Sequence, residues 1–373
     1  MVRRIFVLLI MLAVMVLFTY LGDQDSIKSL SPTLILGTLL LAAYSLGFVL
    51  DKIKLPKITA YIVAGLLFGP YLIDFISDDS INDLSFINSL ALSFIAFCAG
   101  GELKLTNIRN RLKTIIYLSI TQTFIVFFGV SIIVFFLLDQ IPFFSDLVFV
   151  QRLIVSLIFG VISVARSPSS TIAIISETKA KGAYTDVVLS VTVLIDVVVI
   201  ILFGITISFC QVLAATDAPV DWLFFLFLMF EILVALVLGF ILGKGIIFLI
   251  ESVKVEFPIV ILGIGFLVIK FSHLFTDYMR ETYDIAVNLE PLLICMAAGF
   301  TIQNFSNYGR RFLVKMENIS LPIYIVFFTI TGASINLGVL KESWLFGIII
   351  VVVRVVMLFA ATMVSGVISK DEP

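Results

Sequence analysis

The sequence predicts an all-α membrane protein with about twelve transmembrane helices. Hydrophobic residues make up 61% of the 373 residues and charged residues only 13%, which is about half the charged share of an average soluble domain. Apolar runs near the ~20 residues that a helix needs to cross a bilayer recur along the whole chain. Short polar connections separate these runs, and no stretch has the composition of a soluble domain.

The expected helices cover residues 5–21, 33–50, 58–77, 84–103, 113–138, 150–176, 185–213, 222–250, 257–275, 287–304, 319–339 and 343–368, with the longest polar connection at 276–288. The first run follows Arg3 and Arg4 and has a signal peptide as its alternative interpretation. It is long for the apolar region of a signal peptide, and no small-x-small cleavage site follows it. We therefore expect an extra N-terminal helix and loop in residues 1–32 and the main transmembrane domain in residues 33–373.

Basic loop residues predict the orientation of these helices. If the segments alternate, 17 of the 24 lysines and arginines fall on one side, and four fall on the other, at Lys28, Arg152, Arg280 and Lys341. Basic loops remain in the cytoplasm, so both termini are expected there, with the protein in a bacterial inner membrane.

Composition also excludes several classes of function. The net charge of −2 argues against a nucleic-acid partner. The three cysteines fall inside apolar runs, and the single histidine offers no metal-ligand spacing. No glycine-rich nucleotide loop is visible, so we expect no cofactor and no enzymatic activity.

Three ionisable residues interrupt the apolar runs near their centres: Arg166, Asp196 and Arg354. Charged side chains in hydrocarbon are costly, rare and usually functional. Near the first of them, Pro168 removes a backbone hydrogen bond and disfavours helix in the residue before it. Lipid cannot satisfy the freed carbonyls, so a broken helix must face protein or water there. A proline kink patched by serines is the alternative, but a kink does not need a buried guanidinium.

Asp196 is the candidate ion-binding residue. It lies 11 residues beyond Thr185, or ~17 Å along a helix, near the centre of a hydrocarbon core of about 30 Å. A lone carboxylate there binds a cation or a proton but not both, and exchange requires only such competition. Its alternative role is a structural ion pair with Arg166. Arg354 would either counter Asp196 or hold unwound backbone carbonyls.

Two runs of small residues predict close helix packing. Gly65–Pro70 also contains a helix break, and Thr331–Ser334 forms a second seam of small side chains. Small residues allow two helix backbones to approach each other closely.

In their order along the chain, these motifs resemble the cation/proton antiporter superfamily, in particular the sodium/hydrogen exchanger-type membrane domain of bacterial monovalent-cation antiporters. The matching segments are the second core helix at Leu55–Pro70, the third at Phe94–Leu103, the unwound crossing helix at Ala165–Ile175, the paired acidic motif at Asp196, the helix at Pro322–Gly332 and the buried basic residue at Arg354.

The resemblance implies an antiporter-type inverted-repeat fold, a homodimer and secondary active exchange of Na⁺ or K⁺ for H⁺ by alternating access. Asp196 would bind the transported alkali cation, helped by oxygens at Thr192, Ser169, Ser170 and Thr171. Arg166 and Arg354 would compensate charge. A core bundle would move against a dimerising bundle.

The chain also departs from the family pattern. Ile195 precedes Asp196 where electrogenic relatives carry a second carboxylate, so the resemblance does not support a two-proton stoichiometry. Arg166 and Ser167 occupy the unwound stretch, where many relatives carry threonine, aspartate or serine. Relatives continue past the Arg354 helix with a second broken helix and a final helix, so the repeat is expected to lack its last two helices here.

Two other functions remain open from the sequence. A channel-like or regulatory membrane subunit without turnover would use Arg166 and Asp196 as a locked pair. A transporter of a small organic anion would instead bind the substrate carboxylate with Arg166 and Arg354.

Overall fold

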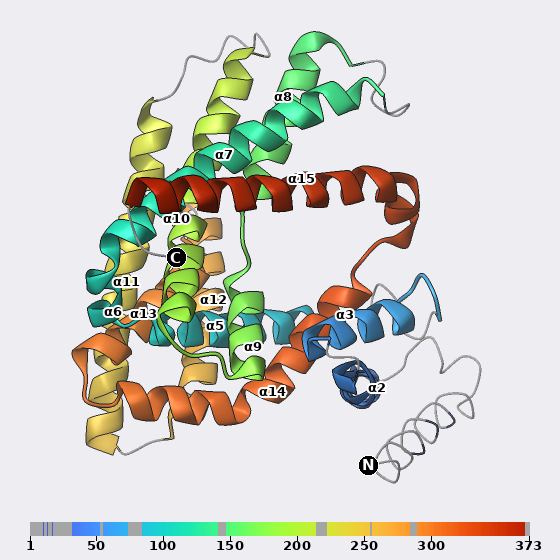
Figure 1. Cartoon of the computed structure of the whole chain (residues 1–373). Helices are drawn as coiled ribbons and strands as arrows, with labels where there is room; N and C mark the ends of the chain where they lie inside the picture. The colour runs from blue at the N-terminus through green and yellow to red at the C-terminus, as the bar shows by residue number, and fades with distance from the viewer. Residues whose placement is uncertain are drawn as a thin grey trace.

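The computed structural model describes residues 32–52, 55–73, 84–140, 147–213, 222–253, 256–283 and 289–369, together with Ile10, Ala13 and Leu17. Within these residues the chain forms 13 helices and no strand (Figure 1), which confirms the all-α class. The helix expected at 5–21 lies outside the described residues apart from those three positions.

The helices are α2 (Pro32–Lys52), α3 (Lys57–Phe68), α5 (Ser85–Glu102), α6 (Leu105–Asn110), α7 (Leu112–Leu138), α8 (Phe149–Val164), α9 (Pro168–Thr178), α10 (Ala183–Leu213), α11 (Trp222–Val253), α12 (Phe257–Tyr283), α13 (Pro291–Phe305), α14 (Gly309–Ala333) and α15 (Leu337–Ser369). Seven of them are long and apolar enough to cross a membrane: α2, α7, α10, α11, α12, α14 and α15. The chain is therefore an integral membrane protein.

Apolar runs located the helices but misplaced several ends. α3 ends at Phe68 rather than at residue 77, because Gly69 and Pro70 follow it. α12 continues to Tyr283, so much of the polar connection expected at 276–288 is helical. α14 begins at Gly309, ten residues before the expected start. In both α12 and α14 the helix extends into polar sequence, where hydropathy gives no signal.

The helices form two bundles (Figure 1). The first bundle contains α2, α3, α5, α11, α12, α13 and α14, and its core includes Phe97, Phe257 and Phe312. The second bundle contains α7, α8, α10 and α15, and its core includes Val130 and Ile195. A separate apolar cluster from α5, α9, α10, α11 and α13 joins them, and this cluster defines the bundle boundary.

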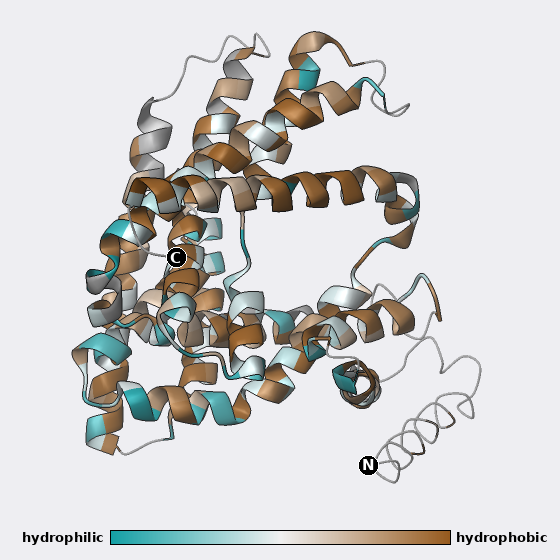
Figure 2. Cartoon of the chain, viewed as in Figure 1, coloured by the Kyte–Doolittle hydropathy of each residue, from teal (hydrophilic) through white to brown (hydrophobic). Residues whose placement is uncertain are grey.

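Apolar surface covers much of the second bundle. Figure 2 shows hydrophobic residues along nearly all of α15, whereas hydrophilic residues gather where α14 begins. Only 11% of the apolar span in α15 is buried within the protein. A helix that is apolar and yet exposed in this way fits a lipid environment.

The two predicted seams of small residues pack against each other at the contact between α3 and α14. A Cβ added at Gly65 would lie 1.9 Å from the Thr329 carbonyl oxygen, and one added at Gly332 would lie 2.1 Å from the Ile62 carbonyl oxygen. Both distances are far below van der Waals contact, so the helix backbones touch only because these side chains are absent.

We predict that Gly65→Ala lowers the midpoint of thermal unfolding in detergent. The added methyl meets backbone rather than a flexible side chain, and such overpacking costs about 1–3 kcal/mol. Gly347→Ala is the matched control, because nothing lies within 4 Å of a Cβ at that helical position. Equal midpoints for the two variants would contradict the packing.

Candidate functional site

The expected helix at 150–176 is broken at the predicted place. α8 ends at Val164 and α9 begins at Pro168, with Ala165 (φ −55°, ψ 140°) and Ser167 (φ −92°, ψ 107°) in extended conformations. Proline forces this geometry on the residue before it and occupies the first helical position of α9, where no amide hydrogen bond is lost. The break therefore follows directly from local sequence.

Ser167 caps the new helix. Its hydroxyl oxygen accepts hydrogen bonds from the Ser170 amide at 3.2 Å and from the Ser170 hydroxyl at 3.1 Å. The hydroxyl of Thr171 donates to the Ser167 carbonyl at 3.1 Å. An N-cap serine satisfies amides that the first turn leaves without a partner. The hydroxyls of Ser167, Ser170 and Thr171 therefore stabilise the start of α9 directly after the break.

Side chains from the neighbouring helices also contact the break. Arg354 of α15 donates a hydrogen bond from its guanidinium to the Ala165 carbonyl. Arg166 donates to the Gln122 side-chain oxygen of α7 at 2.7 Å, and Gln122 in turn donates to the Thr362 hydroxyl of α15 at 3.0 Å. Arg354 was expected either to counter Asp196 or to hold unwound backbone carbonyls. The hydrogen bond from Arg354 to the Ala165 carbonyl corresponds to the second role.

Asp196 lies at about the height of this break. α9 and α10 form a hairpin around the turn at Lys179–Gly182, where Lys179 (φ 52°) and Gly182 (φ 121°) adopt left-handed backbone conformations. Ile172 of α9 packs in one cluster with Val193 of α10. Asp196 follows Gly182 by as many residues as Ala165 precedes Lys179, so the half-buried carboxylate is about level with the unwound segment.

The arginines and Asp196 are not paired. In the part of the chain that the structure describes, no ion pair joins Asp196 to Arg166 or to Arg354. The two guanidiniums are instead close enough for their charges to interact with each other. Both donate to neutral acceptors, so the locked Arg166–Asp196 pair considered from the sequence does not form in this conformation.

The remaining predicted ligands lie on α9 and α10. Thr192 is buried one turn before Asp196, and its hydroxyl donates to the Val188 carbonyl at 2.8 Å, so its lone pairs stay available. Ser170 and Thr171 are in the first turn of α9. The side chain of Ser169 lies outside what the structure describes.

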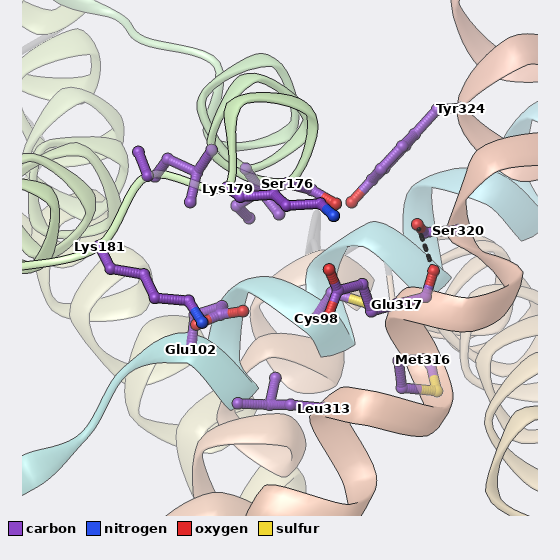
Figure 3. Close-up of a pocket in the computed structure, with 13 residues that line it drawn as sticks. Cys98, Glu102, Ser176, Lys179, Lys181, Leu313, Met316, Glu317, Ser320 and Tyr324 are labelled. Carbon is purple, nitrogen blue, oxygen red and sulfur yellow. Dashed lines mark hydrogen bonds between the residues drawn. The ribbon is translucent and has the colours of Figure 1, made fainter.

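A cavity of about 360 Å³ opens between α5, α9 and α14, on the side of the α9–α10 turn. Charged residues from both sides of the bundle boundary line it, namely Glu102, Lys179, Lys181 and Glu317. Figure 3 shows Lys181 extending toward Glu102 across the cavity. Its lining reaches Ile172, the residue after Thr171.

Sequence reasoning missed Gln122 and Thr362. Both lie inside apolar runs and are uncharged, so neither stands out as an intramembrane ion does. The useful signal was weak: a glutamine in the middle of a membrane helix needs hydrogen-bond partners from other helices. Buried Gln122, only 5% exposed, finds two of them.

The fold and the broken crossing helix define the class of protein: a polytopic membrane protein built like a secondary transporter. Residues 35–370 match the family described as sodium/hydrogen exchanger, transmembrane. The chain therefore belongs to this sodium/hydrogen exchanger family, as the resemblance in its motifs predicted.

Known relatives agree with this assignment. The chain is 20% identical over 319 residues to a protein named Na(+)/H(+) antiporter 1 from Methanocaldococcus jannaschii, covering 84% of this chain and 71% of the relative. The electron-microscopy structure of the sodium proton antiporter MjNhaP1 from that organism superposes with a TM-score of 0.70 at 18% identity, over 91% of this chain and 78% of the other. A structure of MjNhaP1 at pH 8 gives a TM-score of 0.63 at 17% identity, over 91% and 79%. The structural likeness establishes the antiporter fold.

We predict that Arg354→Met speeds amide hydrogen exchange in residues 163–171. Methionine keeps much of the length of the side chain but cannot donate, and a carbonyl left without a partner costs about 1–3 kcal/mol. Arg310→Met, at an exposed position of α14, removes the same charge without touching the break. If both variants exchange like the parent protein, Arg354 does not hold the segment.

Proposed function

We propose that this protein exchanges a monovalent cation for protons by alternating access, with Asp196 as the ion-binding group. Membership of the exchanger family supports the class of activity. One observation supports the role of Asp196. Its carboxylate is half-buried at the height of a broken helix, and neither arginine forms an ion pair with it. Such a group can take up a cation or a proton.

The proposed cycle requires only this competition. Deprotonated Asp196 binds the cation, and protonated Asp196 releases it. Hard cations prefer oxygen ligands, and the hydroxyl of Thr192 and the hydroxyls of Ser170 and Thr171 supply oxygens near the break. One proton exchanged for one monovalent cation moves no net charge.

Arg166 and Arg354 have a supporting role in this proposal. Each donates to a neutral oxygen, so their charges remain uncancelled near the unwound segment and can balance Asp196 at longer range. Membership of the exchanger family counts against an organic-anion carrier. A regulatory lock between Arg166 and Asp196 would need an ion pair that the described residues do not form.

The division into two bundles with separate cores supports alternating access. In our proposal the second bundle carries Asp196 past the first bundle, which serves as the scaffold and dimer contact. The cavity beside the α9–α10 turn then gives water and ions a path from one side. The basic residues of that turn support a cytoplasmic location for this side of the protein.

We predict that Asp196→Asn abolishes cation-driven proton movement in proteoliposomes that contain a pH-sensitive dye. Asparagine has nearly the same shape but neither charge nor a titratable proton. Na⁺ and K⁺ are tested separately, because oxygen ligands alone do not choose between them. Glu251→Gln, at an exposed position near the end of α11, is the matched control and retains activity.

Three outcomes distinguish the proposed function from the other candidates. Normal exchange by Asp196→Asn removes Asp196 from the mechanism. Ion flow down a gradient without proton movement indicates a channel. Uptake of an organic anion that depends on Arg166 indicates an anion carrier.

A further inference from the structure

Helix α13 is too short to cross a membrane and begins inside it. It has 15 residues, about 21 Å from Pro291 to Phe305 at 1.5 Å per residue. Gly239 and Gly243 of α11 pack beside Ala297 and Thr301, so α11 and α13 run in the same direction. Because the helices alternate, Phe305 is on the same side of the membrane as the start of α10. Pro291 therefore lies about 20 Å deep.

Asp196 lies at the same depth. It follows Ala183, the first residue of α10, by 13 residues, which is also about 20 Å along the helix. Val193 and Val197 of α10 pack in the boundary cluster with Leu293 and Ile294 of α13. The middle of α10 and the start of α13 therefore meet at the bundle boundary.

Glu290 is the residue that immediately precedes α13. Its side chain is half-buried and makes no cap hydrogen bond, and no ion pair to it occurs in the described ranges. Its neighbour Leu289 is only 5% exposed. An acidic side chain at this depth without a basic partner is costly and rare unless it has a function.

The Glu290 and Asp196 carboxylates are close enough for their charges to interact. We propose that Glu290 is a second carboxylate of the transport site, supplied by the first bundle, which faces Asp196 across the bundle boundary in this conformation. This inference rests on the proposed function. In α10, Ile195 occupies the position where electrogenic relatives carry a second carboxylate. Under this inference, Glu290 supplies that second carboxylate from a different helix and a different bundle.

Two helices carry other charged or titratable groups near Glu290. α11 carries Glu231 at a corresponding height, since Glu231 precedes Gly239 about as far as Glu290 precedes Ala297. α12 carries Lys270 and His273, both exposed. In the described chain, α5 has no charged residue before Glu102, and α14 has none after Glu317.

The arrangement has a chemical consequence. Two facing carboxylates repel each other, and either a bound monovalent cation or a proton relieves the repulsion. When the second bundle moves, it carries Asp196 away while Glu290 stays with the first bundle. The cation therefore enters a site with two carboxylates and leaves from a site with only one. Glu290 thereby favours cation binding in the conformation seen here.

Neutral substitution of Glu290 tests the inference in proteoliposomes. Glu290→Gln removes the charge, and Glu290→Ser does so while providing a favourable N-cap for α13. Without the facing charge, Asp196 holds a proton less readily, so the acid limb of the exchange profile moves to lower pH by about one unit. The apparent KM for the cation at high pH rises roughly fivefold, as expected for the loss of one nearby charge.

The controls separate charge from structure. Glu290→Asp keeps the charge and should keep the pH profile of the parent, while Glu281→Gln removes an exposed acid of α12 and changes nothing. If Glu290→Gln or Glu290→Ser is less stable but has the parent pH profile and KM, Glu290 is only structural. That result, with Asp196→Asn inactive, overturns this inference and leaves the proposed function intact. An active Asp196→Asn removes both.

Discussion

A helix broken inside a bilayer must find partners for its backbone, because lipid offers none. In this protein that constraint falls on Ala165–Ser167, and Arg354 meets it by donating to the Ala165 carbonyl from a helix 189 positions away. The Arg166–Gln122–Thr362 chain fastens the same segment to α7 and α15. The second bundle is thus assembled around its own broken helix.

These contacts also explain how two arginines can coexist with Asp196, the carboxylate that we propose binds the ion. A guanidinium paired directly with Asp196 would compete with any transported cation. Hydrogen bonding to a carbonyl and to an amide oxygen uses donors of both arginines while leaving their charge in place. The Asp196 carboxylate then stays free to bind and release ions, as the proposed function requires.

The first bundle and the boundary between the bundles are held together in different ways. In the first bundle, glycines bring backbones into contact, as at Gly65 and Gly332, and such seams are stiff because no side chain can yield. The boundary between the bundles is lined by ordinary aliphatic side chains such as Leu189, Val193 and Ile294. Apolar surfaces of this kind can slide past one another at small cost, whereas the glycine seams cannot. A boundary of this kind between two bundles is compatible with the alternating access that we propose.

The sequence by itself determined the membrane class, most helix positions and the break before Pro168, and it singled out Arg166, Asp196 and Arg354 as candidate site residues. Each of these follows from local chemistry: hydropathy over about 20 residues, a missing amide, or a charge in lipid. Only the tertiary structure decided that Arg166 binds Gln122 rather than Asp196, and that Glu290 reaches the depth of Asp196. Those facts depend on which helices are neighbours and how far each one starts from the membrane surface, and hydropathy along one chain carries no record of either.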